Sequence, residues 1–317
     1  MTAAPVTDAS RERHSATLYV LAAAVLFGTT GTAQALGPDN VDPVTVGAVR
    51  IAVGATVLLA VARRRNGAGW WRALPRWPLL IGGLAVASYQ ACFFAAVERT
   101  GVAVGTVVAL GSAPAFTGAL TVFLLRERPV PVWCLATVLA VAGASLIALG
   151  GGDASVDAAG VVLALGAGGS YAGYTLASKA LLTAGVDSDA AMAAIFSVGA
   201  LALVPTYVVR SLAWLPTGRG VGLAAFLGVV PTAIAYQLFA RGLRRLPGST
   251  VTTLTLAEPA TAVVLGALVL GERPGARAVV GMALVGSGLV LLAGRRPRAG
   301  RPAHGLASED GISGSPL

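Results

Sequence analysis

A motif near the middle of the chain returns close to its end, at an offset of about 145 residues. Leu-Leu-Arg-Glu-Arg-Pro, which ends at Pro129, matches Val-Leu-Gly-Glu-Arg-Pro, which ends at Pro274. The same offset superposes Pro114 on Pro259 and further pairs: Gly83 on Gly228, Phe94 on Phe239, Arg99 on Arg244, Leu120 on Leu265, Gly143 on Gly288 and Leu146 on Leu291. A register held over so much of the chain predicts two copies of one structural unit.

The sequence between these landmarks predicts membrane-spanning helices. Only 12% of the 317 residues are charged, against roughly 25% in an ordinary soluble domain, so the chain cannot cover a water-soluble surface. A spanning helix needs about 20 mostly apolar residues. Such runs lie near 17–36, 43–62, 78–98, 101–125 and 131–149, and again near 158–181, 189–210, 220–240, 246–270 and 275–293. They lack the alternation typical of a transmembrane β-barrel.

The number of spans in each half sets the expected architecture. Because each half has an odd number of spans, the second half must enter the membrane from the opposite side. The predicted fold is an all-α integral membrane protein with ten transmembrane helices, arranged as two inverted five-helix repeats. We expect a cytoplasmic N-terminal tail at 1–16, repeat 1 at 17–150, repeat 2 at 158–293 and a disordered cytoplasmic tail at 294–317.

The positive charges indicate the orientation of these helices. The net charge is +9, but the arginines are sorted by side of the membrane, which argues against a nucleic-acid partner. With ten spans, one side receives both termini and Arg63, Arg64, Arg65, Arg72, Arg76, Arg126, Arg128, Arg241, Arg244, Arg245, Arg295, Arg296, Arg298 and Arg301. That side is predicted to be the cytoplasm. Since Lys179 is the only lysine, we expect a GC-rich bacterial source and a location in the bacterial cell membrane.

Several motifs of the second half resemble the EamA branch of the drug/metabolite transporter superfamily. They are Gly-Val-Val-Pro-Thr-Ala-Ile-Ala-Tyr-Gln-Leu-Phe-Ala from Gly228, Thr-Leu-Ala-Glu-Pro-Ala from Thr255, and Leu-Gly-Glu-Arg-Pro ending at Pro274. The first half matches with Phe27-Gly28, Val49-Arg50, Ser112-Ala113-Pro114 and Arg126-Glu127-Arg128-Pro129. The resemblance covers about residues 17 to 293, and implies a ten-helix exporter-like carrier of amino acids, other metabolites or drugs.

Glu258 is the first candidate for a transport role. If its helix begins at Leu246, the carboxylate lies about 12 residues in, or roughly 18 Å along a helix, near the middle of a hydrocarbon core about 30 Å thick. A charge at that depth must face a polar region, find a partner or hold a proton. One hypothesis is that Glu258 binds a proton or the ammonium group of the substrate and links the two. The alternative is a protonated side chain that only hydrogen-bonds a neighbouring helix.

Polar and aromatic side chains on four predicted spans form a second set of candidates. On the spans near 17–36 and 158–181 they recur every three or four residues, which places each set on one helix face. The set comprises Thr30, Gln34, Tyr89, Gln90, Tyr171, Tyr174, Tyr236 and Gln237, with Phe27 beside the first two. Amides and phenols need partners that lipid cannot supply, so these side chains should point inward. Interhelical packing without substrate contact is the alternative.

Arg50 is the candidate for binding a negative group. It lies about seven residues from the outer end of its span, roughly 10 Å deep, where its long stem can still reach the interface. We interpret it as an anchor for a substrate carboxylate or as a partner of Glu98. Snorkelling towards the headgroups or a structural ion pair is the alternative.

Three prolines are candidate hinges. Pro114 and Pro259 lie at equivalent mid-span positions, and Pro231 lies in the span near 220–240. Each removes a backbone donor and can bend its helix. They are predicted bending points for alternating access, in which one repeat rocks against the other, with static kinks as the alternative. The Gly-rich run 281–288 favours close helix packing rather than a phosphate loop.

These features together predict a transporter. The sequence has no nucleotide-binding motif or nucleophile triad, so we expect no enzyme, and no metal site or cofactor is predicted. The predicted function is secondary active transport of a small organic metabolite, an amino acid or a related compound, by alternating access and in the outward direction. Proton coupling rests on Glu258 alone. The expected partners are the substrate and the lipid bilayer, with a homodimer left open. A broad multidrug exporter and, outside this class, a membrane enzyme or structural partner protein are the alternatives.

Overall fold

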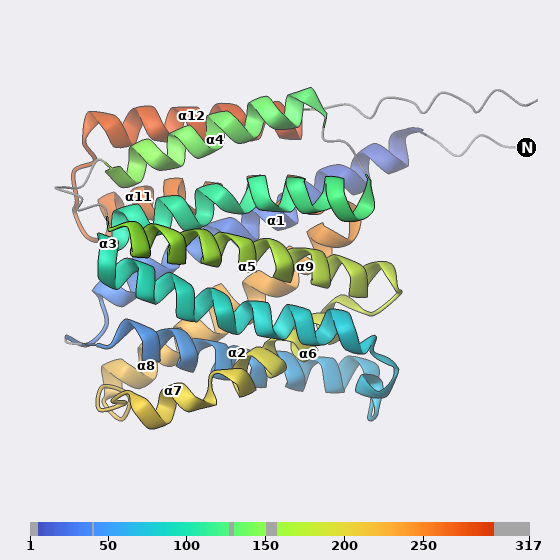
Figure 1. Ribbon diagram of the computed structural model, residues 1–317, viewed down its shortest axis with the longest axis horizontal. Helices are drawn as coiled ribbons and strands as arrows, with labels where there is room; N and C mark the ends of the chain where they lie inside the picture. The colour runs from blue at the N-terminus through green and yellow to red at the C-terminus, as the bar shows by residue number, and fades with distance from the viewer. Residues whose placement is uncertain (1–5, 40, 127–129, 150–156, 295–317) are drawn as a thin grey trace, which may run out of the picture.

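The computed structural model describes residues 6–39, 41–126, 130–149 and 157–294, which form helices and loops without a β-strand in these ranges. The elements, labelled in Figure 1 where there is room, are α1 (Val6–Ala35), α2 (Pro43–Asn66), the 3-10 helix η1 (Trp70–Ala73), α3 (Arg76–Leu125), α4 (Pro131–Leu149), α5 (Ala158–Thr183), α6 (Ser188–Ala202), α7 (Val204–Val209), α8 (Gly218–Gly228), the π-helical segment η2 (Val229–Ile234), α9 (Ala235–Arg245), α10 (Gly248–Leu254), α11 (Ala257–Val269) and α12 (Ala276–Ala293).

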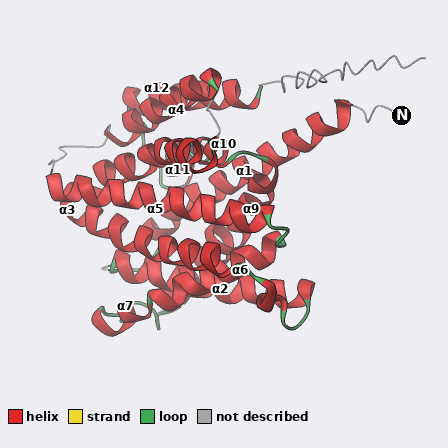
Figure 2. Cartoon of the chain, turned by 45° about the vertical axis from the view of Figure 1, so that its right-hand side comes forward, coloured by secondary structure: helices red, strands yellow, loops and turns green. Residues whose placement is uncertain are grey.

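The helices form one bundle in which α3 folds back on itself. In Figure 1 the two legs of α3 meet at the left, and α5 lies between them. The helices α4 and α12 pack together along the upper edge, and α2 packs with α6 along the lower edge, an arrangement that Figure 2 shows from another direction. The helix α1 contacts α9 and α11. The beginning of α1 and the end of α12 lie at the same, right-hand end of the bundle in Figure 1.

Nine stretches of the described residues are long and apolar enough to cross a membrane. They are 11–35, 43–66, 76–101, 104–124, 131–149, 188–209, 218–245, 248–269 and 276–293. Each corresponds to one predicted span. The predicted span near 158–181 is the exception, because α5 forms as a 26-residue helix but is not among the nine. Its glycines, tyrosines and Lys179 make it more polar than the others. The chain is a multi-pass membrane protein.

The helices differ from the predicted spans in several places, of which the first two concern the N-terminal half. The helix α1 begins at Val6, within the segment predicted as an N-terminal tail. The two spans predicted near 78–98 and 101–125 are joined in α3, where Gly101 is the single residue with non-helical backbone angles, at φ 79° and ψ 162°. A positive φ costs glycine little because it has no Cβ. The chain therefore reverses direction at Gly101 without a loop.

Side chains just before several helices fix where they begin. Asp42, Asp157, Asp187 and Thr217 each occupy the position before a helix and accept a hydrogen bond from a backbone N–H of its first turn. Asp42, for example, accepts from the N–H of Val44 at 2.8 Å. These bonds satisfy donors that the helix itself leaves unpaired.

The helices α4 and α12 approach each other through glycines. A Cβ on Gly143 would lie 2.5 Å from the carbonyl oxygen of Gly281, and a Cβ on Gly281 would lie equally close to the carbonyl oxygen of Gly143. Gly288, the repeat equivalent of Gly143, would in the same way meet the carbonyl oxygen of Ala136 at 2.6 Å. Small residues allow such approach between helices in a membrane. The prediction that the run 281–288 serves close packing is confirmed for Gly281 and Gly288.

We expect Gly281→Leu to destabilise the protein by about 3 kcal/mol, because the new side chain must push α4 and α12 apart. Thermal unfolding of the purified protein in detergent measures the loss. Gly286→Leu is the matched control on the same helix, since no heavy atom lies within 4 Å of a Cβ placed there. Equal melting temperatures of the two variants would contradict the prediction.

Candidate functional site

Glu258 lies where a membrane-spanning helix is broken. The helix α10 ends at Leu254 and α11 begins at Ala257. Pro259 causes the break, because its ring clashes with the carbonyl group four residues earlier, that of Thr255, and it has no N–H to donate. The N–H of Glu258 donates instead to the carbonyl oxygen of Thr255, three residues earlier, at 2.9 Å. The carboxylate thus sits in the first turn of α11, where the helix dipole favours negative charge.

Groups from four other helices lie within electrostatic reach of Glu258. Its charge interacts with the guanidinium group of Arg50 on α2. It also interacts with the hydroxyl groups of Tyr89 on α3, Tyr171 on α5 and Tyr236 on α9. Arg50, Tyr89, Tyr236 and Glu258 all remain partly exposed within their membrane-spanning stretches. The sequence predicted these five residues as separate candidates, and the fold brings them to one place, which we call the central site.

Aromatic rings form one side of the central site. Tyr236 lies 4.4 Å from Phe196, 4.9 Å from Phe27, 5.7 Å from Tyr174 and 6.0 Å from Phe239, measured between ring centroids. Such tilted and edge-on pairs stabilise a cluster beyond the burial of apolar area.

The aromatic cluster extends through Tyr171. The ring of Tyr171 contacts those of Tyr89 and Tyr174, each at 6.0 Å between centroids. The hydroxyl of Tyr171 donates to Thr255 Oγ1 at 3.4 Å, next to the helix break. The aromatic side of the site is therefore tied to the broken helix.

Arg50 is held by Gln90 from the neighbouring helix. Arg50 Nη2 donates to Gln90 Oε1 at 3.2 Å, and Gln90 is only 3% exposed. The alternative partner expected for Arg50 was Glu98, but Glu98 lies 3.7 Å from Arg210. That pairing is thus corrected: Arg50 pairs with an amide, because Gln90 shares its level in the bundle and Glu98 lies about two turns further along α3.

The remaining polar candidates are distributed unevenly. Thr30 is partly buried on α1, and Gln237 is partly buried beside Tyr236 on α9. Gln34 is exposed, one residue before the end of α1. The structure therefore groups Thr30 and Gln237 with the interior of the bundle and leaves Gln34 at its surface.

Two ring-bearing residues of the cluster were not anticipated. Phe239 follows Tyr236 by three residues, so the helical period places both on one face of α9. Phe196 on α6 has no such signal, because the residues three and four positions away on the helix, Met192, Ala193, Gly199 and Ala200, are all apolar or small. Only the packing of α6 against α9 shows that it belongs here.

Gly28 allows α1 to pack directly against the broken helix. A Cβ at this position would lie 2.9 Å from the carbonyl oxygen of Glu258 and 2.7 Å from Thr261 Cβ. Any larger residue must therefore move α1 away from the first turn of α11. The Phe27-Gly28 pair thus supplies both an aromatic ring and a close backbone approach at the central site.

Two of the three candidate hinges lie at irregular backbone. Pro259 lies just after the break between α10 and α11. Pro231 lies in the π-helical segment η2, where Thr232 Oγ1 donates to the carbonyl oxygen of Leu227, five residues earlier, at 2.8 Å. Pro114, by contrast, lies in a part of α3 with helical backbone angles. The two repeats therefore differ at the equivalent prolines, as they do at Ala113 and Glu258.

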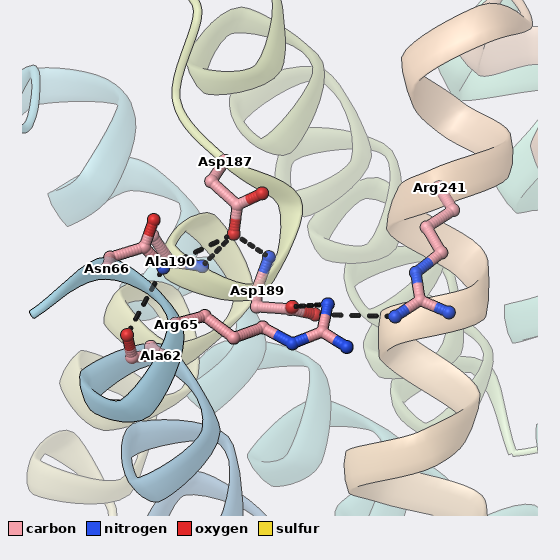
Figure 3. A network of polar contacts seen from close by, with 7 residues as sticks. All are labelled: Ala62, Arg65, Asn66, Asp187, Asp189, Ala190 and Arg241. Carbon is pink, nitrogen blue, oxygen red and sulfur yellow. Dashed lines mark hydrogen bonds and ion pairs between the residues drawn. The ribbon is translucent and has the colours of Figure 1, made fainter.

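A second polar cluster closes the end of the bundle at which α1 begins. Figure 3 shows Asp189, at the start of α6, between two arginines of different helices. Its carboxylate lies 2.8 Å from Arg65 at the end of α2 and 3.9 Å from Arg241 on α9. The side chain of Asp189 is only 2% exposed, whereas those of Arg65 and Arg241 are 61% and 36% exposed. Asn66 Nδ2 adds a weaker bond to Asp187 Oδ1 at 3.4 Å. Sequence reasoning did not single out this cluster.

The model of the EamA-like transporter family matches the chain twice, over residues 14–149 and 158–294. The chain belongs to the EamA-like transporter family. This membership makes it a transmembrane transporter, as the motifs around Phe27-Gly28 and Glu258-Pro259 predicted, and points away from an enzyme.

Named relatives agree with this assignment. The uncharacterized transporter YwfM of Bacillus subtilis is 41% identical over 293 residues, covering 90% of this chain and 97% of the relative. The threonine/homoserine exporter RhtA of Escherichia coli is 34% identical over 261 residues, covering 80% of this chain and 83% of the relative. A probable terminal-alkyne amino-acid exporter of Streptantibioticus cattleyicolor is 32% identical over 197 residues, covering 60% and 65%.

A solved structure supports the fold. One crystal structure superposes with a TM-score of 0.75 over 87% of this chain and 96% of its own, at 23% identity. At that identity the likeness concerns the fold alone.

Proposed function

We propose that the chain is a secondary active exporter of a small amino acid or a closely related metabolite. It works by alternating access between two inverted five-helix repeats, with α5 as the tenth span and Glu258 as the group that couples transport to protons. Both termini face the cytoplasm of a bacterial cell.

The inverted arrangement is supported by the course of the chain. In Figure 1, α1 runs from right to left, and α5, its counterpart under the repeat, runs from left to right. The start of α1 and the end of α2, which carries Arg65, lie at the right-hand end. Arg241 faces the same carboxylate as Arg65. Excess arginine marks the cytoplasmic side of bacterial membrane proteins.

The observation that carries the proposal is the position of Glu258. Its carboxylate lies at a break in a spanning helix, within electrostatic reach of Arg50 and three tyrosines from other helices. Substrate and ion sites of transporters with inverted repeats are built at such discontinuous helices. A buried charge that serves only packing would not need partners from both repeats.

The substrate class is supported by the relatives. Two of those described above are named as exporters of amino acids, one of threonine and homoserine. A mixed site of acid, base and aromatic rings suits such solutes, since a few polar groups usually fix the orientation of a small ligand.

Transport measured in proteoliposomes tests the proposal. Vesicles that are acidic inside are offered labelled amino acids, including L-threonine, and separately hydrophobic cationic dyes, with protein-free vesicles as the control. We expect accumulation of one or a few amino acids that collapses when the pH gradient is dissipated. Accumulation of many unrelated cations would instead support a multidrug exporter, and no movement of any solute would reject the proposal.

A further inference from the structure

We propose that Arg50 and Gln90 form a subsite for the carboxylate group of the substrate, so that the protein selects zwitterionic amino acids over amines. The proposal rests on the proposed function, because it names the chemical class that the central site accepts. In this arrangement Arg50 binds the carboxylate group of the ligand, and Glu258 binds the ammonium group of the same ligand.

Arg50 and Gln90 present a surplus of buried hydrogen-bond donors. Arginine can only donate hydrogen bonds, so the Gln90 atom that faces Arg50 must be its oxygen, which leaves Gln90 Nε2 as a donor. Gln90 Nε2 and Arg50 Nε are both buried without a hydrogen-bond partner among the described residues. A buried donor without an acceptor costs about 1–3 kcal/mol. Two such donors on adjacent side chains indicate a missing acceptor.

The positive charge of Arg50 calls for an anionic acceptor. Glu98 pairs with Arg210, and within the described part of the chain no carboxylate lies within 4.0 Å of Arg50. A guanidinium group at this depth is costly unless it is paired. Its planar fork matches a carboxylate, which can accept two parallel hydrogen bonds. The acceptor that fits the surplus donors is therefore an anionic carboxylate.

Glu258 supplies the opposite charge of the central site. Glu258 is close enough to Arg50 for their charges to interact, yet the two do not form an ion pair within 4.0 Å. A ligand that carries a carboxylate and an ammonium group can lie between them, with its carboxylate at Arg50 and its ammonium group at Glu258. A cation without a carboxylate would leave Arg50 unpaired and bring a like charge towards it, which opposes its binding.

The backbone supports this arrangement of Arg50 and Gln90. Gly47 precedes Arg50 by three residues and shares its helix face. A Cβ at Gly47 would lie 2.7 Å from Gln90 Nε2 and would collide with the ring of Phe94. The glycine therefore leaves the space in which the amide of Gln90 lies beside Arg50, on a rigid helix rather than a loop.

The test compares ligands that differ only in the carboxylate. Purified protein in detergent is heated with L-threonine, with L-threoninamide and with 1-amino-2-propanol, which retains the amine and hydroxyl but lacks the carboxylate. Competition with L-threonine flux in proteoliposomes gives a second readout. We expect stabilisation and competition by L-threonine, and roughly tenfold to hundredfold weaker effects of the two analogues, as for loss of a charge-assisted hydrogen bond.

Two variants assign that preference to the proposed subsite. Arg50→Gln should weaken binding of L-threonine by about tenfold or more, because the carboxylate contact is lost. Binding of 1-amino-2-propanol should not weaken and should improve, since this amine loses no contact and is freed from the repulsion by the guanidinium group. Gln90→Glu keeps the bond to Arg50 and the shape of the side chain, but its own carboxylate takes the place of the ligand's. It should abolish the preference even if Arg50→Gln fails to fold. Arg277→Gln, an exposed arginine at the start of α12, is the matched control.

The outcomes separate this proposal from the proposed function. Equal competition by L-threonine and 1-amino-2-propanol in the parent protein, with flux intact, would overturn the carboxylate subsite and leave the transporter assignment standing. Carboxylate-dependent stabilisation that Arg50→Gln removes, without flux of any solute, would support the subsite and reject transport. If neither stabilisation nor flux depends on the carboxylate, the subsite is wrong.

Discussion

Replacing Glu258 by glutamine is expected to abolish accumulation of substrate in proteoliposomes that are acidic inside. Glutamine keeps the size of the side chain and can still hydrogen-bond, but it cannot release a proton as substrate binds. Binding of the proton and binding of the substrate are linked at Glu258 by a coupling free energy. Loss of this coupling should lower gradient-driven flux by about tenfold or more. Exchange of labelled for unlabelled substrate needs no net proton movement and should persist, although ammonium binding will weaken.

The surroundings of Glu258 make this substitution specific. The charged and titratable groups within its electrostatic reach are Arg50, Tyr89, Tyr171 and Tyr236. All of these stay in place in Glu258→Gln. Glu258→Asp, which retains an acid, should keep a dependence on the pH gradient.

The matched control for Glu258→Gln is Glu98→Gln. Glu98 is 51% exposed and pairs with Arg210 at 3.7 Å, remote from the helix break. Its removal should leave gradient-driven flux unchanged. If Glu258→Gln accumulates substrate as the parent does, and responds to the gradient in the same way, Glu258 is a structural residue and proton coupling must reside elsewhere.

The second large effect is expected from removing Arg65 and Arg241 together. Asp189 is almost fully buried between them, and without either cation it would be an uncompensated buried charge. Breaking a buried ion pair in this way costs about 3–5 kcal/mol. Asp189→Ala should cost less, since the two arginines keep 61% and 36% of their side chains exposed and can be solvated by water.

Unfolding of purified variants in detergent measures this difference. We expect Arg65→Ala with Arg241→Ala to lower the melting temperature more than Asp189→Ala, although two partly exposed residues are changed rather than one buried residue. A double variant of the exposed arginines Arg63 and Arg277 controls for the loss of two positive charges. A larger drop in melting temperature for Asp189→Ala than for Arg65→Ala with Arg241→Ala would contradict the prediction. It would show that the two arginines are not what compensates the buried charge of Asp189.

The sequence predicts the positions of the helices better than it predicts which of their faces meet. The spans near 43–62 and 131–149 were predicted within a few residues of α2 and α4. In lipid every backbone N–H and C=O must be paired within the segment, so an apolar run of this length has to be a helix. The helix α5 is the exception to this rule, because it is a long helix but less apolar than the nine candidate spans. A helix that packs inside the bundle among tyrosines need not be apolar.

The faces of the helices were harder to predict. In a soluble protein a polar face marks the side that meets water, but in a membrane both lipid and protein interior are apolar. The residues three and four positions from Phe196 are apolar or small, so no polar pattern on α6 turns that ring towards Tyr236. Gln34 carried the same signal as Thr30 but lies too close to the end of α1 to be buried.

The sequence by itself determined the helices, the duplication and the resemblance to a transporter family, and it singled out Glu258 as a candidate, since each depends on local composition or on comparison of one half with the other. Only the tertiary structure decided that Arg50 pairs with Gln90 rather than Glu98, that Arg65 meets Asp189 across 124 residues, and that charges from different helices converge on the central site. The physical reason is that helix packing determines which buried polar groups become partners. A helix that is apolar all round has no local sequence pattern that identifies its packing face.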